Sequence, residues 1–289
     1  MKFVLLPLLA SLTASLGNVS IRLFQEKVQK NRRDLQVFQA LYTFLSSLVF
    51  LFVSGFRFPG TTAGLLLTVA FAGCLLASTI GLAQSYLCGP MSLSGVIISC
   101  SVVMPVAFGC LAYGEVLTLT RLLGIGFLLA AFIVTGAGSG EGKKEITFRW
   151  ILWVMVSFLG SGFGAIVLAV YSRLPETGTN NGFMAISFFV EACMLSLGVL
   201  FARRPGEKAR VTAPFFGLAS LSALGCFGTN LLVIYLSGIM PASLLHPVYN
   251  GAAATVVTII SCLAFREKMN RKKLAIILLG ICAIVFLNL

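Results

Sequence analysis

The sequence predicts an all-α membrane protein with ten transmembrane helices, arranged as two inverted repeats of five helices each. Three observations lead to this prediction: the composition, the number of long apolar segments and an internal repeat. Of the 289 residues, 58% are hydrophobic and only 10% are charged, and the mean hydropathy is +1.00. So few polar residues cannot cover the surface of a soluble globule, and we therefore expect the chain to lie in a lipid bilayer.

Ten segments are long and apolar enough to cross a bilayer as helices. A spanning helix needs ~20 mostly apolar residues, because its backbone groups must be paired within the segment where water is absent. In chain order, the expected spans are residues 3–24, 36–55, 61–86, 91–112, 119–138, 148–172, 182–202, 212–237, 241–262 and 271–289. The connections between them are short, polar or glycine-rich, which leaves no room for a soluble catalytic domain.

The net charge of +12 is distributed unevenly among the connections. Of the 21 Lys and Arg residues, 17 fall in or beside odd-numbered loops, and the others are Lys2, Arg57, Arg121 and Arg173. Because basic loops stay cytoplasmic, this pattern predicts that the odd loops lie inside and both termini outside. The first 15 residues also resemble a signal peptide, but that interpretation would place the basic residues of 22–33 outside. We expect no nucleic acid partner, since such a chain offers no exposed basic face.

The segment 110–136 repeats at 262–288, which is a shift of 152 residues. Seven of the 27 aligned positions are identical, including the Glu115/Glu267 pair, and Arg121 aligns with Lys273. We interpret this as a duplication, with a first repeat at 1–138, a linker at 139–147 and a second repeat at 148–289. Five helices per repeat is an odd number, so the second copy must enter the membrane upside down, as in many secondary transporters.

Each repeat ends in an acidic turn followed by a glycine-containing helix, and this arrangement resembles the drug/metabolite transporter (DMT) superfamily, EamA type. The first copy fits the family pattern GE-x-L-T with GEVLT at 114–118, whereas the second has Arg266 and Asn270 at the corresponding positions. The resemblance implies alternating access to a central cavity lined mainly by helices 1, 3, 4, 6, 8 and 9. Many members have cytoplasmic termini, in contrast to the orientation that the charges indicate here.

Polar side chains inside the spans are the candidates for function. In the first, third and eighth spans these are Asn18, Gln84 and Asn230. Each of these side chains could contact a solute or form a hydrogen bond to a neighbouring helix. In the sixth span, Gly160 and Gly164 have the spacing of residues that allow close helix packing. Glu115 and Glu267 each stand at the start of a repeat's last helix, where a carboxylate favours the positive end of the helix dipole; we expect a structural cap rather than transport chemistry.

Glu191 lies nine residues into the seventh span, which is otherwise uncharged. A carboxylate at that depth costs several kcal/mol unless it is paired, protonated or hydrated. The shift of 152 residues aligns it with Gln39. Glu191 could therefore couple proton movement to transport, and the alternative is a protonated carboxyl that fixes the seventh helix to its neighbours.

The ninth span contains the sequence HPVYNG at 246–251, which supplies the candidate solute contacts His246, Tyr249 and Asn250. Pro247 leaves one carbonyl without its usual donor, and His246 and Asn250 share a helix face. The corresponding span of the first repeat has Ser94, Ser99 and Pro105 instead. A buried histidine with only a structural role is the alternative.

We expect from this pattern a secondary active transporter that moves a small organic solute by alternating access, with possible proton coupling through Glu191. The alternative is a flippase-like or accessory subunit acting on a lipid-linked substrate.

Neither an enzyme nor a metal or other cofactor is indicated, because the chain has one histidine, no CxxC and no catalytic motif. We expect a multi-pass protein of the plasma membrane, in bacteria the inner membrane. A monomer suffices for this architecture, and a dimer is compatible with it. The scarcity of buried basic residues argues against a multiply charged anion as the solute.

Overall fold

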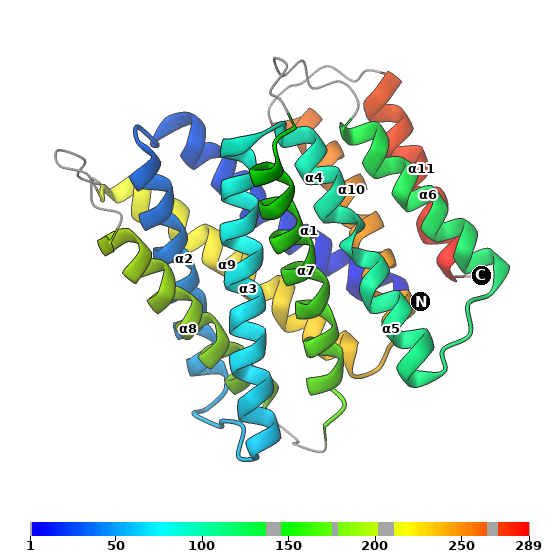
Figure 1. Ribbon diagram of the computed structural model, residues 1–289, viewed down its shortest axis with the longest axis horizontal. Helices are drawn as coiled ribbons and strands as arrows, with labels where there is room; N and C mark the ends of the chain where they lie inside the picture. Colours follow the sequence, from blue (N-terminus) through cyan, green and yellow to red (C-terminus); the bar gives the residue numbers. More distant parts are fainter. Residues whose placement is uncertain (1, 137–145, 175–178, 202–210, 265–270, 289) are drawn as a thin grey trace.

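The protein is a bundle of long helices, shown in Figure 1. The computed structural model describes residues 2–136, 146–174, 179–201, 211–264 and 271–288. Its elements are α1 (Lys2–Lys27), α2 (Arg32–Val53), α3 (Thr62–Cys88), α4 (Met91–Ser99), η1 (Cys100–Val102), α5 (Val103–Tyr113), α6 (Leu119–Gly136), α7 (Phe148–Tyr171), α8 (Asn180–Phe201), α9 (Ala213–Ser237), α10 (Ala242–Ala264) and α11 (Arg271–Asn288).

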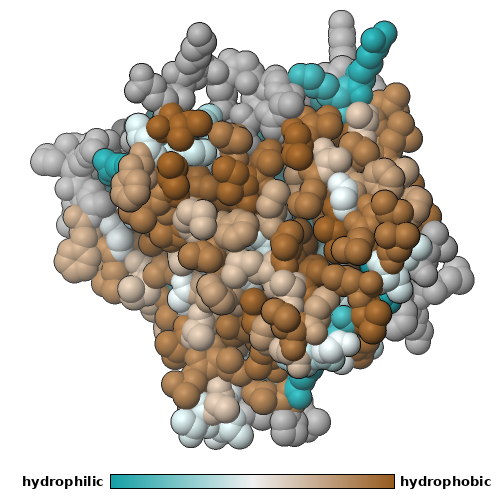
Figure 2. Space-filling view, turned by 45° about the vertical axis from the view of Figure 1, so that its right-hand side comes forward, coloured by the Kyte–Doolittle hydropathy of each residue, from teal (hydrophilic) through white to brown (hydrophobic). Residues whose placement is uncertain are grey.

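Eight of these segments in the described chain are long and apolar enough to cross a membrane. They include the combined α4–η1–α5 segment, and α6 contributes a further apolar stretch of 17 residues, Leu119–Thr135. The last helix, α11, is apolar after its three basic residues at 271–273. Figure 2 shows apolar side chains over much of the visible flank of the bundle. The chain is thus a multi-pass helical membrane protein, as its composition predicts.

Helices that are distant in the sequence form the most extensive contacts. These pairs are α3 with α7, α1 with α9, α2 with α8, and α6 with α11. In Figure 1 the α2–α8 pair lies at one edge of the bundle and the α6–α11 pair at the other. The remaining helices lie between these edges, so the centre of the bundle contains α1, α3, α4–α5, α7, α9 and α10.

The expected span 91–112 is not one continuous α-helix. It divides into α4 and α5, with the 3₁₀ turn η1 between them. Pro105 explains the interruption, because a proline has no N–H to donate to the carbonyl of Ser101, four residues earlier. The backbone responds with tighter 3₁₀ geometry, which is typical of a local break in a helix. Such a break is tolerated inside a membrane where it is covered by protein or lines a polar cavity.

Glycines allow close crossings of α3 with α7 and of α1 with α9. A Cβ added to Gly81 of α3 would lie 2.6 Å from the backbone nitrogen of Ser157 in α7, and one added to Gly160 would lie 2.7 Å from that of Ser78. The prediction that Gly160 permits close packing is therefore confirmed. At the α1–α9 crossing, a Cβ on Gly225 would lie 2.6 Å from the nitrogen of Gly17. Close approach of this kind supplies the van der Waals contact that holds helices together in lipid.

The largest apolar core lies where α7, α8, α9 and α10 meet the first helices of the chain. Within it, the rings of Tyr171 and Phe183 stack with centroids 3.9 Å apart, and Phe50 packs against Phe227 at 4.7 Å. The Phe50–Phe227 contact joins the first half of the chain to the second, whereas the Tyr171–Phe183 stack joins α7 to α8 within the second half.

The substitution Gly81→Leu should reduce the stability of the bundle, since any Cβ at this position overlaps the backbone of α7. We expect a loss of about 1–3 kcal/mol, the range for overpacked sites. Gly73→Leu on the same helix is the matched control, because no atom lies within 4 Å of its added Cβ. Thermal unfolding in detergent would measure both, and equal midpoints for the two variants would contradict the close crossing.

Candidate solute site

A partly open polar cavity of about 300 Å³ lies between helices of the bundle. The broken helix α4–η1–α5, α7 and α10 form its walls. Its polar lining consists of Ser99, Ser101, Ser161, His246 and Asn250, with Ile98, Val102, Pro105 and Ala165 between them. This volume is in the range of small-molecule sites.

The break in the first-half helix shapes one wall of this cavity. Ser99 ends α4, Ser101 lies within η1, and Pro105 lies in the first turn of α5. A continuous α-helix would bond the Ser101 carbonyl to the amide at position 105, but proline has no such amide. The break therefore accompanies two hydroxyl-bearing residues, Ser99 and Ser101, in the cavity wall. Discontinuous helices form solute sites in this way in many transporters.

His246 of α10 forms part of the opposite wall. Its side chain is only 7% exposed, and its Nε2 atom has no hydrogen-bond partner among the described residues. A buried polar atom without a partner costs about 1–3 kcal/mol, so native proteins leave few of them. One turn further, Asn250 donates a hydrogen bond of 2.9 Å from Nδ2 to the carbonyl of His246. The cavity wall thus combines an imidazole ring with an amide and three hydroxyl-bearing residues, while the Nε2 atom itself is covered by protein.

The chemistry of the lining favours an uncharged, hydrogen-bonding ligand. Within the described chain, the side chains at the cavity include no Asp, Glu, Lys or Arg. The described residues also contain no group of three His, Cys, Asp or Glu that could hold a metal ion. Serine hydroxyls donate and accept, and so does an amide, which suits a solute with both functions.

A second polar cluster surrounds Glu191 of α8. This side chain is 3% exposed, and its Oε1 accepts a hydrogen bond of 2.9 Å from Thr79 of α3. Tyr42 of α2 and Cys226 of α9 lie close enough to interact with it electrostatically. The carboxyl group is therefore located where four helices meet, and it does not line the cavity of His246.

Two serines connect these regions across the α3–α7 crossing. Ser78, the neighbour of Thr79, shares a hydrogen bond of 2.7 Å with Ser161, and Ser161 lines the cavity. Ser157 of α7 also donates to the carbonyl of Ser78, at 3.0 Å. A displacement of α3 at Thr79 would therefore reach the cavity wall through hydrogen-bonded neighbours.

Glu115 forms a charged contact at one end of the cavity-lining helices. Its carboxylate accepts hydrogen bonds from the backbone amides of Ala242 at 3.0 Å and Ser243 at 2.9 Å, and from Arg173 at 3.1 Å. The guanidinium of Arg173 also lies 3.6 Å from the ring centroid of Tyr113. We call this group of residues the Glu115 latch. It connects the turn after α5 to the end of α7 and to the start of α10, one turn before His246.

The latch depends on two glycines in the first half of the chain. Gly114 has φ of +64°, a left-handed conformation that glycine adopts without strain, and it turns the chain after α5. A Cβ on Gly109 would lie 2.5 Å from Oε2 of Glu115, so only glycine leaves room for the carboxylate. The expectation that Glu115 caps a helix is met, but the capped helix is α10 rather than the following helix α6. Glu267 lies outside the described residues.

The structure brings some of the predicted site residues together and separates others. His246 and Asn250 line one cavity, along with Ser99 and Pro105 of the corresponding first-half span. Ser94 instead accepts a hydrogen bond of 2.8 Å from Trp150. The remaining candidates do not line this cavity: Tyr249 packs against the large apolar core, Asn230 donates to the carbonyl of Cys226 in its own helix, Gln84 is half-buried on α3, and Asn18 is exposed on α1.

Sequence reasoning missed Ser101 and Ser161 of the cavity and Arg173 of the latch. Ser161 lies between Gly160 and Gly162, and the glycines drew attention only to packing. A polar residue within a run of small residues, at a position where two helices approach closely, is the signal that could have identified it. For Arg173, an isolated basic residue at the end of a span was such a signal.

The pKa of Glu115 lies below its ordinary value of 4.5, although burial by itself would raise it, because hydrogen bonds from Ser243, Ala242 and Arg173 outweigh the burial. A lowered pKa in the folded state adds stability above pH 4.5 that is lost as the pH falls through the folded pKa. Glu115→Gln should therefore destabilise the protein by about 1 kcal/mol at pH 7, as loss of a helix cap does, and by less at pH 3.5.

Glu26→Gln provides the control for this experiment. Glu26 forms an exposed pair with Arg22 at 2.9 Å, and such pairs contribute little to stability. Unfolding midpoints of the two variants at pH 7 and pH 3.5 would measure the difference. A pH-independent effect of Glu115→Gln would show that its carboxylate charge does not stabilise the latch.

Comparison with known proteins gives evidence about the fold alone. No family model matches the chain, and no curated protein matches it. Among the solved structures that match, one described only as "Crystal structure of protein" has a TM-score of 0.74 at 14% identity. The match covers 99% of this chain and 96% of that one. The whole chain is therefore similar in fold to a solved protein.

Proposed function

We propose that this protein is a secondary active transporter that moves a small, uncharged polar organic solute across the membrane by alternating access. The observation that carries the proposal is the polar cavity between the two halves of the chain, which is lined by three serines, His246 and Asn250. A site between helices from both halves of the sequence is the arrangement that alternating access requires. The resemblance to the EamA-type transporters is part of the same proposal.

The helix pairs support two inverted repeats of five helices. In these repeats, α1, α2, α3, α4–α5 and α6 correspond in order to α7, α8, α9, α10 and α11. The pair α3–α7 then corresponds to the pair α9–α1, and the helices of both pairs are in extensive contact. The pairs α2–α8 and α6–α11 each correspond to themselves, and α2–α9 corresponds to α8–α3, which is also present. Such a correspondence is expected of a twofold axis in the membrane plane.

In this proposal the Glu115 latch closes one end of the transport pathway. It joins the first repeat, through Glu115 and Tyr113, to the second repeat, through Arg173 and the start of α10. Separation of the repeats at this end would break these contacts together. In this proposal, that end and both termini lie outside the plasma membrane, because most of the basic residues belong to loops at the other end.

The Glu191 cluster is the proposed coupling site. Protonation of the carboxyl would change its hydrogen bond with Thr79, and the adjacent Ser78–Ser161 bond leads to the cavity wall. A coupling group needs a different interaction in each of two states, and a carboxyl between α3 and α8 can provide it.

A flippase-like activity on a lipid-linked substrate is the second candidate, and one feature favours it. An apolar groove between α2 and α8 opens on the flank of the bundle. However, Ser47 is the only polar side chain that the described residues contribute to this groove, so it offers no path for a polar headgroup. The polar cavity lies on other helices, which is why solute transport is the proposal we favour.

A thermal-shift screen of the purified protein with neutral sugars, polyols, amides, nucleosides, amino acids, amines and lipophilic cations tests the proposed function. A ligand at a hundredfold excess over its Kd raises stability by ~2.7 kcal/mol. We expect stabilisation by one uncharged polar class, followed by its uptake into proteoliposomes. Absence of stabilisation in folded protein would contradict the proposal and favour the lipid-linked alternative.

His246→Ala combined with Asn250→Ala should weaken binding of that solute by about 5- to 150-fold, since each substitution removes a hydrogen bond worth about 0.5–1.5 kcal/mol. Ser222→Ala is the control, because Ser222 also carries a buried polar atom without a partner in the described chain but does not line this cavity. The measurement is the solute Kd beside the unfolding midpoint without solute. A fall in stability with unchanged Kd would assign His246 a structural role.

Glu191→Gln should flatten the pH dependence of transport in proteoliposomes, because an amide keeps the shape of the carboxyl but cannot release a proton. Thr79→Val removes the hydrogen bond to Glu191 and should shift the pH profile without abolishing it. Full activity of Glu191→Gln with an unchanged pH profile would exclude Glu191 as the coupling site.

A further inference from the structure

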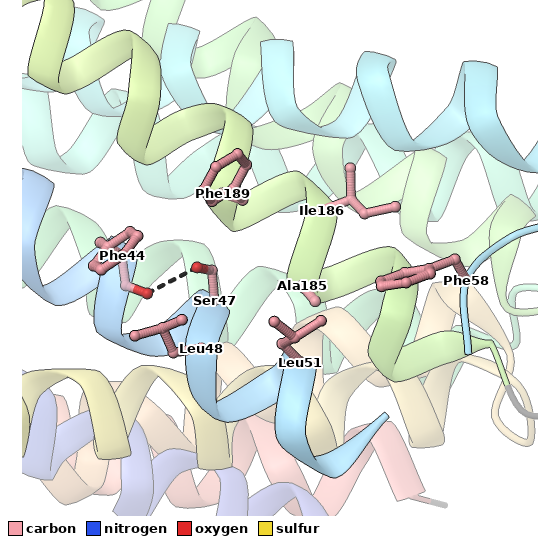
Figure 3. A pocket seen from close by; sticks show the side chains of 8 residues that line it. All are labelled: Phe44, Ser47, Leu48, Leu51, Phe58, Ala185, Ile186 and Phe189. Atoms are coloured by element: carbon pink, nitrogen blue, oxygen red, sulfur yellow. Dashed lines mark hydrogen bonds between the residues drawn. The ribbon is translucent and has the colours of Figure 1, made fainter. Parts of the chain in front are cut away.

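The groove between α2 and α8 is a second cavity, separate from the proposed solute site, with a volume of about 330 Å³. Figure 3 shows its lining: Phe44, Leu48 and Leu51 from α2, Ala185, Ile186 and Phe189 from α8, and Phe58 from the loop at one end. Three of the rings are partly exposed, with Phe44 at 38%, Phe58 at 43% and Phe189 at 49%. The groove therefore opens on the outer surface of the bundle, which faces lipid.

The chemistry of the groove suits a hydrocarbon chain. Its one polar side chain among the described residues, Ser47, donates its hydroxyl to the carbonyl of Phe44 at 2.8 Å, as the dashed line in Figure 3 shows. The lining thus presents aromatic and aliphatic carbon without an unsatisfied polar group. Inside a bilayer, the apolar molecules available to fill such a groove are the acyl chains of lipids.

The groove also has the direction of an acyl chain. Phe58 lies in the loop after α2, and the other α2 residues extend from Leu51 to Phe44, away from that loop. At 1.5 Å per residue, Leu51 and Phe44 are about 10 Å apart along the helix axis. A chain that enters beside Phe58 therefore runs parallel to the helices, from the membrane surface toward its middle.

A positive charge stands at the surface end of the groove. Arg57 directly precedes Phe58, its side chain is exposed, and it forms no ion pair within the described part of the protein. Its backbone carbonyl packs against Gly182 in the first turn of α8, where any Cβ would overlap it. This contact fixes the loop across the ends of α2 and α8. An unpaired arginine at the level of the headgroups complements a lipid phosphate, which guanidinium binds through paired hydrogen bonds.

From the apolar groove, its direction and the adjacent arginine, we propose that the α2–α8 groove binds an anionic phospholipid, with one acyl chain between Phe44 and Phe58 and the headgroup at Arg57. This site does not depend on the proposed transport function. The lipid would complete the packing of α2 against α8, the helix that carries Glu191.

Lipid binding to the detergent-solubilised full chain by native mass spectrometry tests the headgroup part of the proposal. The probes are dioleoyl-phosphatidylglycerol and dioleoyl-phosphatidylcholine. Arg57→Gln should weaken phosphatidylglycerol binding about fivefold, the effect of one basic residue near a membrane surface. Arg121→Gln, which removes a charge at the same end of the bundle on α6, should leave this binding unchanged. Equal affinities for the two lipids, or equal effects of the two substitutions, would overturn the proposal.

Photo-crosslinking tests the position of the acyl chain. Phosphatidylglycerol with a diazirine in one acyl chain should label residues 44–51 and 185–189, and Ile186→Trp, which fills the groove, should abolish this labelling. Labelling of other helices with these segments unlabelled would overturn the site. So would a dimer in which a second copy covers α2 and α8 and excludes the lipid. Neither measurement involves solute, so a failure of the lipid-site proposal leaves the transporter proposal intact.

Discussion

The constraint on which this structure depends is that backbone amides and carbonyls inside a bilayer must find partners within the protein. Helices satisfy it along most of the chain, and the exceptions are therefore informative. Pro105 and Pro247 each remove a donor from a membrane-spanning helix, and both lie at or next to the polar cavity. The cavity thus lies where two helices each lose a backbone donor, and in the proposed function its polar side chains bind the solute.

Close helix packing determines how these breaks face one another. The glycines at the α3–α7 and α1–α9 crossings bring backbones together, and hydroxyl groups such as Ser78 and Ser161 then meet at hydrogen-bonding distance. Small residues thereby serve two purposes: they maximise contact in an environment without a hydrophobic driving force, and they place polar atoms within reach. The carboxyl of Glu191 and the nitrogen of His246 occupy separate regions, connected through this crossing.

The sequence predicted the helical membrane architecture and part of the cavity, because both follow from local patterns. Hydropathy located the spans, and the rarity of buried polar residues singled out His246, Asn250 and Glu191. It did not predict that Tyr249, Asn230, Gln84 and Asn18 lie away from this cavity, since rotation about a helix axis depends on neighbouring helices. The partners of Glu115 were equally inaccessible: proximity to α6 in sequence suggested one helix, whereas three-dimensional packing supplied the amides of another.

The Glu115 latch also has a consequence for biosynthesis. The carboxylate that caps α10 lies 127 positions before Ala242, so it is made well before the helix whose amides it binds. Until α10 is inserted, Glu115 has none of its partners from that helix, and α10 alone begins after Pro241 without this acidic cap. The start of α10 thus becomes complete only when it meets the earlier half of the chain. Assembly of the two halves is in this respect a step of folding itself, rather than the docking of two finished parts.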